Sequence, residues 1–184
     1  MKIGIICFSS YGGSGAMATE LGINLAKQGH KVHFITSEVP FRLIGGWKKN
    51  IFFHRVESPI YPLFKGGELY SLTLANKIAS IVEEERLEIV HAHYAVDYGT
   101  LGVLSRFHPF VLSVWGSDVY GAVDFSWLQQ QALRYKLSKA DYILSTSEAM
   151  ALETHKYTDK KIGVIPFGVD MELFRPLVKK NETG

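Results

Sequence analysis

Seven short apolar segments recur along the 184-residue chain, and segments with helical periodicity separate most of them. A short continuous apolar run is typical of a strand that is covered on both faces of its sheet. Strands that alternate with helices form βαβ units with right-handed crossovers. The sequence therefore predicts an α/β, Rossmann-like, doubly wound domain with a mostly parallel seven-strand sheet. The expected strands are residues 2–8, 31–36, 50–56, 87–93, 109–115, 141–146 and 161–166.

Helices are expected between these strands, at residues 15–28, 70–85, 98–107 and about 125–138, with one more beginning near residue 147. In the first of them, Met17, Leu21 and Leu25 recur at a spacing of four and share a face. Gly29 follows where a C-terminal cap is needed. Residues 83–85 are three glutamates at the end of the second helix, where they oppose the helix dipole. We interpret these glutamates as a solvated face.

The overall charge argues against a nucleic-acid partner. Twenty basic and 18 acidic side chains give a formal net charge of +2, whereas nucleic-acid binding domains carry a strong basic excess. The lone Cys7 has no disulfide partner in the chain and is expected to be a small core residue. No apolar run approaches the roughly 18 residues that span a bilayer. A cytoplasmic protein is the expectation.

A glycine-rich loop, Gly12, Gly13, Ser14 and Gly15, lies between the first strand and the first helix. Glycine permits close approach of a ligand to the backbone, and free N–H groups at a helix N-terminus favour an anion. Ser14 is a candidate cap for that helix. The loop therefore predicts a phosphate or carboxylate site, and a tight turn without a ligand is the alternative.

The same loop leaves a nicotinamide-binding module open as a rival interpretation. From Gly13 the spacing begins as G-x-G, and Ala18 occupies the third position of the fingerprint as its tolerated variant. Glu38, after the second strand, is placed where the ribose-binding acid is expected. The loop is not a P-loop, because no Gly-Lys-Ser/Thr sequence follows it.

The fourth strand ends in His91, Ala92, His93 and Tyr94. Positions 91 and 93 face the same side of a strand, but neither a cysteine nor a clear carboxylate set completes a metal site there. No metal is therefore expected. Two interpretations remain open for these histidines, a hydrogen-bonding role at a polar cleft and a satisfied structural position. His93 and Tyr94 are taken as candidate acceptor-binding residues.

The fifth strand ends in Trp115, Gly116, Ser117 and Asp118. Gly116 permits an abrupt turn, and Ser117 and Asp118 are able to bond either nearby backbone or a ligand hydroxyl. Trp115 offers a flat face on which a sugar ring stacks, and a core position is its alternative. Ligands of doubly wound sheets bind beyond the carboxyl ends of the strands, where all these residues are expected.

Taken together, these segments resemble the N-terminal domain of the GT-B glycosyltransferases, specifically the retaining family 4. The resemblance covers nearly the whole chain and includes residues 12–36, "EIVHAHYA" (88–95), "VWGSDVYG" (114–121), "ADYILSTSEAM" (140–150) and "IGVIPFGVDMELFRP" (162–176). It implies a nucleotide-sugar donor, with the glycine loop near the donor diphosphate and the acceptor. The family usually carries His-Gly-x-Asp after the fifth strand, and Trp115 replaces that histidine here. No catalytic residue is therefore assigned.

Part of the chain resembles one subfamily, the enzymes that join N-acetylglucosamine to malate in bacillithiol synthesis. The segments are "HFITSEVPFRL" (33–43), "YPLF" (61–64) and "HAHYA" (91–95). The resemblance implies that Ser14, Arg42 and Tyr94 hold acceptor carboxylates, and a guanidinium fork suits that purpose. Trp115 departs from a close match, so an oligosaccharide or a lipid-linked sugar stays open as the acceptor.

The resemblance also divides the protein into domains. It implies that residues 1–170 form the acceptor-side domain and that 171–184 begin a linker to a second, donor-binding domain outside this sequence. The chain is then a part of a two-domain enzyme, a subunit of a split transferase or a binding module, and no cofactor is expected. A peripheral membrane contact through Trp47, Lys48 and Lys49, flanked by Ile44 and Phe52, is a further hypothesis; a solvated basic turn is its alternative.

Overall fold

The computed structural model describes residues 1–9, 12–44, 49–56, 67–169, 171 and 175, with side chains of the second long helix described from Thr73 onward. Several predicted features lie outside the described residues. These are the membrane contact at Trp47 and Lys48, the segment 61–64 and nearly all of the expected linker at 171–184.

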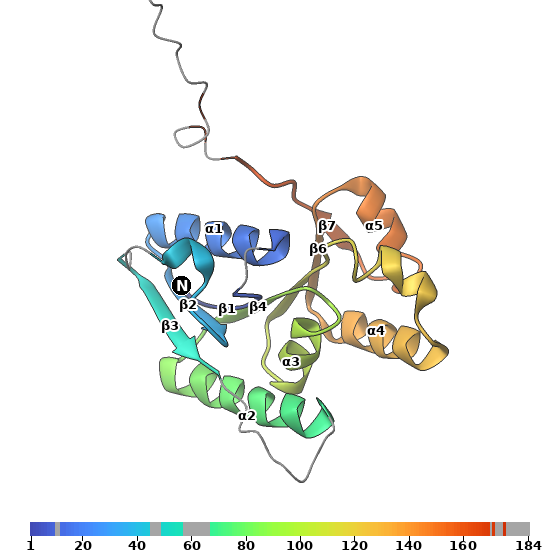
Figure 1. Ribbon diagram of the computed structural model, residues 1–184, viewed down its shortest axis with the longest axis horizontal. Coiled ribbons are helices and arrows are strands. Elements are labelled where there is room, and N and C mark those ends of the chain that lie inside the picture. The colour runs from blue at the N-terminus through green and yellow to red at the C-terminus, as the bar shows by residue number, and fades with distance from the viewer. Residues whose placement is uncertain (10–11, 45–48, 57–66, 170, 172–174, 176–184) are drawn as a thin grey trace, which may run out of the picture.

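Seven strands form one parallel sheet, as the sequence predicts (Figure 1). Their order across the sheet is β3-β2-β1-β4-β5-β6-β7, so the chain reverses its direction of winding beside β1. Except for β2, which has the expected bounds, the strands are shorter than the apolar runs that predict them, because an apolar run reports burial and extends beyond the paired residues. The strands are β1 (Lys2–Ile6), β2 (Lys31–Thr36), β3 (Ile51–Arg55), β4 (Ile89–His93), β5 (Phe110–Ser113), β6 (Tyr142–Ser145) and β7 (Ile162–Val164).

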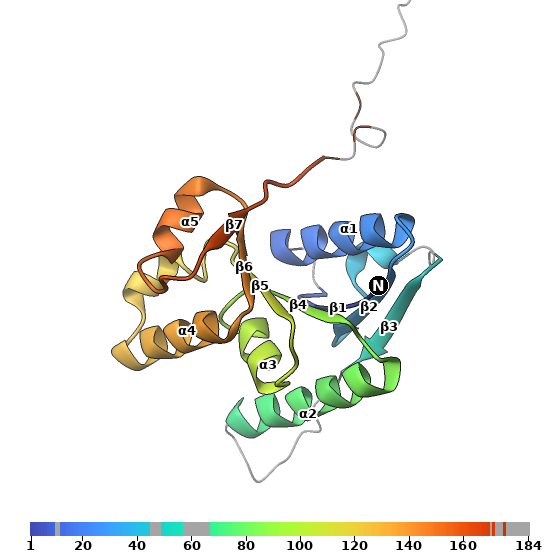
Figure 2. The ribbon, with the colours of Figure 1, turned by 180° about the vertical axis from the view of Figure 1, so that it is seen from behind.

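Helices pack on both faces of this sheet, and Figures 1 and 2 show α1 on one side with α2 and α3 on the other. The core is divided accordingly. Ile5, Ile23 and Phe34 belong to a cluster beneath α1, and Ile78 and Leu112 belong to a larger cluster on the opposite side. The helices are α1 (Gly13–Lys27), η1 (Phe41–Leu43), α2 (Gly67–Glu85), α3 (Tyr98–Leu104), η2 (Tyr120–Asp124), α4 (Trp127–Lys139) and α5 (Glu148–Thr154).

The two ends of α1 differ in how well the sequence predicts them. Gly12 is the N-cap residue and no side chain caps the helix, so the expectation that Ser14 is the cap is wrong; Ser14 lies inside the first turn. Gly29 directly follows the C-cap Gln28 with a φ of +93°, the left-handed conformation that glycine adopts without a Cβ penalty. The predicted C-terminal glycine is confirmed.

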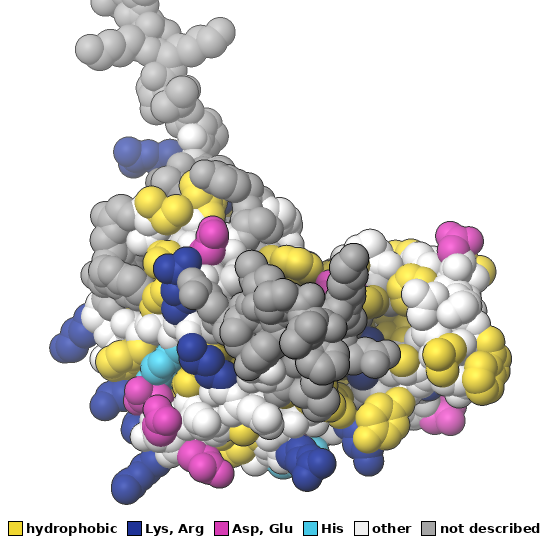
Figure 3. Space-filling view, turned by 60° about the horizontal axis from the view of Figure 1, so that its bottom comes forward, with side chains coloured by type: hydrophobic (Ala, Val, Ile, Leu, Met, Phe, Trp, Pro, Cys, Tyr) yellow, Lys and Arg dark blue, Asp and Glu magenta, His cyan; other side chains and the backbone are white. Residues whose placement is uncertain are grey.

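Two further expectations from the sequence are that Cys7 is a core residue and that the surface charge is balanced. Cys7 is fully buried, and burial raises the pKa of its thiol to about 12, which is the behaviour of an unreactive core residue. Figure 3 shows basic and acidic side chains scattered over one face, with no region of a single sign covering it. None of the helices in the described ranges is long and apolar enough to cross a membrane.

Candidate functional site

A cavity of about 450 Å³ lies beyond the carboxyl ends of the central strands. Its walls come from four parts of the chain that the sheet brings together: the start of α1 and the segments that follow β4, β5 and β7. This is the edge of the sheet, beside the reversal of winding, at which doubly wound folds bind ligands. The lining residues are Gly13, Ser14, Met17, Tyr94, Trp115, Ser117 and Phe167.

The first turn of α1 gives the cavity an exposed set of backbone donors. Gly12 is extended, with φ −61° and ψ 154°, and its carbonyl accepts the N–H of Ala16 at 3.0 Å. The N–H groups of the first helical residues have no carbonyl one turn earlier to bond. No acidic side chain lies in the first turn, and no atom of the described residues lies within 4 Å of a Cβ added at Gly13. The helix start is therefore open to an anion.

Tyr94 turns the chain sharply at the end of β4. Its φ is +92°, a strained conformation for a residue with a Cβ. Two backbone bonds hold it there: its N–H donates to the carbonyl of Ser113 at 3.0 Å, and its carbonyl accepts the N–H of Gly99 at 2.9 Å. The phenol oxygen lies 3.2 Å from the hydroxyl oxygen of Ser117. Strain of this kind collects at functional sites, and both Tyr94 and Ser117 line the cavity.

Asp118 is fully buried and supports the cavity wall from behind. One carboxylate oxygen accepts the N–H groups of Trp115 at 2.8 Å and Gly116 at 2.9 Å, and the other accepts the N–H of Ala95 at 2.8 Å. Burial raises the pKa of this carboxyl group, and the backbone donors oppose that effect. Of the two predicted roles for Asp118, the structure shows the bonds to backbone. The side chain ties the loops after β4 and β5 together.

His93 and Trp115 place unpaired polar atoms next to this wall. His93 is 2% exposed, and its ring lies 4.0 Å from that of His91 and 5.6 Å from that of Trp115. Among the described residues, neither ring nitrogen of His93 nor Nε1 of Trp115 has a hydrogen-bond partner. Burial, and then His91, hold the pKa of His93 well below its usual range, so its ring is neutral at pH 7. Leaving a buried polar atom unpaired is costly, and in native structures such atoms have a specific cause, such as a bound water, an ion or a catalytic role.

His91, in contrast, is a satisfied structural residue. Its Nε2 lies 2.7 Å from the hydroxyl oxygen of Ser113, and burial lowers the pKa of the ring to about 4. The indole of Trp115 stacks on Phe167, with ring centres 4.8 Å apart and planes inclined by 17°. Trp115 is thus partly covered by the segment after β7, and it still lines the cavity.

The sequence-predicted residues occupy three kinds of place. Gly13, Ser14, Tyr94, Trp115 and Ser117 line the cavity. Five others lie next to the lining residues without lining the cavity. They are Gly12, the N-cap of α1; Gly15, which is buried in α1; and the buried residues His93, Gly116 and Asp118.

Arg42 does not line the cavity. Its Nε lies 3.4 Å from Oε1 of Glu20, an acidic residue two turns along α1 from Gly13. Its expected role as a ligand for an acceptor carboxylate stays a prediction.

Two lining residues were missed. Met17 is expected only on a helix face, and Phe167 is not among the predicted site residues. The rule that ligands bind beyond strand ends does include Phe167, because residues 166–170 lie at and just after the end of the seventh expected strand.

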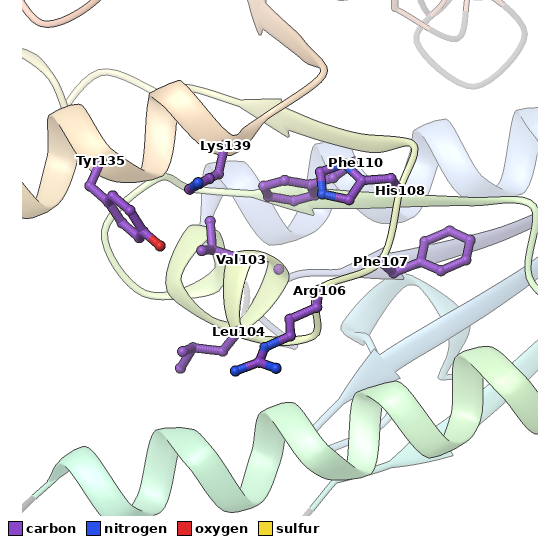
Figure 4. A pocket seen from close by; sticks show the side chains of 9 residues that line it. Val103, Leu104, Arg106, Phe107, His108, Phe110, Tyr135 and Lys139 are labelled. Carbon is purple, nitrogen blue, oxygen red and sulfur yellow. The ribbon is translucent and has the colours of Figure 1, made fainter.

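A second cavity, of about 330 Å³, lies at the amino end of β5 between α3 and α4. Figure 4 shows Tyr135 and Lys139 entering it from one helix and Val103 and Leu104 from another. It is remote from the carboxyl ends of the strands, and none of the predicted site residues lines it.

Comparison with known proteins decides the family. The model of Glycosyltransferase Family 4 matches residues 11–173. The chain belongs to glycosyltransferase family 4. A curated relative of this glycosyltransferase chain, N-acetyl-alpha-D-glucosaminyl L-malate synthase from Bacillus anthracis, is 35% identical to it over 168 residues. That match covers 85% of the chain and 42% of the relative.

The fold of this chain is similar to one part of several longer proteins of known structure. Sucrose-phosphate synthase from Thermosynechococcus elongatus matches with a TM-score of 0.73 at 15% identity, over 96% of this chain and 50% of its own. A glycosyltransferase from Rickettsia africae ESF-5 matches with a TM-score of 0.68 at 18% identity, over 93% of this chain and 44% of its own. The family 4 chain thus spans about half the length of the proteins it resembles.

Proposed function

We propose that this family 4 chain is the acceptor-side domain of a retaining glycosyltransferase. In this proposal, the enzyme transfers a sugar from a nucleotide-sugar donor to an acceptor held in the cavity beyond β1, β4 and β5. The observation that carries it is the uncapped start of α1, whose backbone donors face a cavity that also presents the hydroxyl groups of Tyr94 and Ser117. An anionic group and a hydroxyl-bearing ligand both find partners there.

The acceptor that we propose is a small dicarboxylate such as malate, with N-acetylglucosamine as the transferred sugar. The name of the Bacillus anthracis relative supports this choice. The donors at the cavity also fit a carboxylate, because backbone N–H groups at a helix start and serine hydroxyls bind its oxygens without a balancing charge. An oligosaccharide or a lipid-linked sugar is the second candidate, supported by the exposed Phe167 and the indole of Trp115, on which a sugar ring stacks.

A second domain completes the enzyme in this proposal. Departure of a nucleoside diphosphate needs positive groups placed at the developing charge, and among the described residues that line the cavity there is no lysine or arginine. Donor and acceptor must also be held together for transfer. We propose that the positive groups come from a donor-binding domain that follows residue 170. The chain alone is then inactive, the reaction needs no cofactor, and the protein works in the cytoplasm.

The test uses the complete gene product and the separate domain of residues 1–184. Release of UDP or GDP is measured with a panel of nucleotide sugars, in the presence of malate, an oligosaccharide or a lipid-linked sugar. We expect release only with the complete protein and only with one acceptor class. Steady turnover by residues 1–184 alone would refute the need for a second domain.

Gly13→Val tests the cavity itself. Its side chain enters open space, so the variant should fold, and it should lose most of its transferase activity because the branched side chain blocks ligand approach to the start of α1. The matched control is Gly121→Val, because an added Cβ at Gly121 also meets no atom within 4 Å and this residue is outside the cavity. Full activity of Gly13→Val would show that the loop is only a turn.

Two alternatives are tested by direct binding. NAD and NADP are titrated against the domain, with intrinsic tryptophan fluorescence as the signal; one of the three tryptophans, Trp115, lines the cavity. Micromolar affinity would favour the nicotinamide interpretation, with Glu38 as the ribose partner. Co-sedimentation with anionic vesicles tests the membrane contact, and we expect any such binding to weaken with salt.

A further inference from the structure

Two histidines and one glutamate from distant parts of the chain meet on the face of the sheet opposite α1. His33 comes from β2, His54 from the edge strand β3, and Glu85 is the last residue of α2. Nδ1 of His33 lies 2.9 Å from Nε2 of His54 and 4.0 Å from a carboxylate oxygen of Glu85. One ligand atom from each residue falls within 4.8 Å of the other two. Figure 1 shows how α2 runs along this side of the sheet, near β3.

The packing around the histidines fixes their orientation. The ring of His33 is buried and stacks on the ring of Phe52 at a centre distance of 4.6 Å. Its plane is inclined by 14° to the ring of His54, whose centre lies 5.2 Å away and whose Nε2 faces its Nδ1. The ammonium group of Lys2, on β1, donates a hydrogen bond to the backbone carbonyl of Glu85 at 2.6 Å. That bond holds the end of α2 against the sheet, so Glu85 is half-buried rather than part of a fully solvated acidic face.

Both imidazoles are in the protonation state that a metal ion requires. Burial lowers the pKa of His33 to about 4, and His54 contributes in the same direction. Burial also lowers the pKa of His54, against the opposing effect of Glu85 and Glu84. The other charged groups that face the cluster are Lys2 and Lys31. Each neutral ring has one nitrogen that carries a proton and one that is free to bind an ion. In the ion-free chain one of the two facing nitrogens donates its proton to the other, so binding requires a change of tautomer at that ring but no net loss of charge.

We propose that His33 Nδ1, His54 Nε2 and the carboxylate of Glu85 bind one divalent transition-metal ion, and that zinc fits this donor set best. Two imidazoles and one carboxylate form a recurrent zinc ligand set. Bonds of about 2.0–2.1 Å in a tetrahedral site place neighbouring ligand atoms roughly 3.3 Å apart. The separations of 2.9 Å between the histidines and 4.0 Å between His33 and Glu85 lie on either side of that value, and all three ligand atoms lie within 4.8 Å of one another. Binding therefore requires the Glu85 carboxylate to move toward the two rings.

The ion would have a structural role. It would connect β2, β3 and α2, and thereby fasten the edge strand of the sheet to a helix that crosses it. None of its three ligands lines the cavity described above, so this site is independent of the proposed glycosyl transfer.

The experiment uses the tag-free chain, stripped of metal with a chelator and then titrated with Zn²⁺ by calorimetry. We expect one ion per chain at pH 7. Co²⁺ should give the visible absorption of a four-coordinate ion with nitrogen and oxygen ligands. Zinc at about 100 times its dissociation constant should raise the melting temperature by roughly 5–10 °C, since an ion that binds only the folded state stabilises it by mass action.

Two variants and two matched controls decide the assignment. His54→Ala and Glu85→Gln remove ligands from half-buried positions, and each should weaken Zn²⁺ binding at least tenfold. His155→Ala removes an exposed histidine elsewhere, and Glu83→Gln removes an exposed carboxylate from the same helix; both should bind as the unaltered chain does. The proposal is overturned if the unaltered chain binds no Zn²⁺, or if Glu85→Gln or His54→Ala binds it as tightly as the controls.

Discussion

Replacing Asp118 with asparagine tests whether this buried carboxylate holds the cavity wall together. In the native chain it accepts three backbone N–H groups, from Ala95, Trp115 and Gly116. The amide oxygen of asparagine is able to accept the two donors of the loop after β5. Its NH₂ group then faces the N–H of Ala95, so two donors oppose each other in a buried place.

The magnitude follows from these contacts. A hydrogen bond to a charged group contributes about 1.5–3 kcal/mol, and a buried donor left unpaired costs about 1–3 kcal/mol. Relief of the burial cost, which raises the pKa of Asp118, offsets part of this loss. We expect a net loss of about 2–4 kcal/mol in the free energy of unfolding. For a domain of this size that lowers the melting temperature by roughly 5–15 °C.

The assay is chemical and thermal unfolding of the separate domain, followed by circular dichroism. Asp124→Asn is the matched control, because Asp124 is exposed in the nearby η2 and the same chemical change should cost under about 0.5 kcal/mol there. If Asp118→Asn is as stable as Asp124→Asn, the three backbone bonds do not stabilise the fold and the role assigned to Asp118 is wrong.

Other predictions concern packing and pH. Gly102→Ala should destabilise the domain by about 1–3 kcal/mol, because the added Cβ would overlap the ring of Phe110, whereas Gly121→Ala should be nearly neutral. Equal unfolding midpoints for the two variants would contradict the close packing of α3 on β5. Burial lowers the pKa of His33 and His91 to about 4, so between pH 6.5 and 4 the unfolded chain binds more protons than the folded one. The free energy of unfolding should therefore fall as the pH falls through that range, by up to roughly 1.4 kcal/mol per pH unit for each ring. Urea midpoints at pH 7 and pH 5, measured with a chelator present, check this, and equal midpoints would refute it.

The sequence predicted the architecture because its signals are local. An apolar run of six or seven residues indicates a covered strand, and Gly29 indicates a helix end, without knowledge of the rest of the chain. The parallel sheet then follows from the alternation of strands with helices, and the position of the site follows from the sheet. Gly13, Ser14, Tyr94, Trp115 and Ser117 were found in this way, and all five line the cavity.

Only the tertiary structure decided what the individual side chains do. His91 and His93 look equivalent in the sequence, yet one bonds Ser113 and the other has no partner among the described residues, because the neighbouring strand brings a hydroxyl group to only one of them. Asp118 accepts a hydrogen bond from the N–H of Ala95, 23 residues earlier. The two residues meet because β4 pairs with β5, and no local sequence pattern encodes that pairing. His33, His54 and Glu85 meet because β2 pairs with β3 and α2 ends beside them. Residue type and spacing fix which elements form, whereas the side chains that meet across them depend on the strand order and register that the packed core selects.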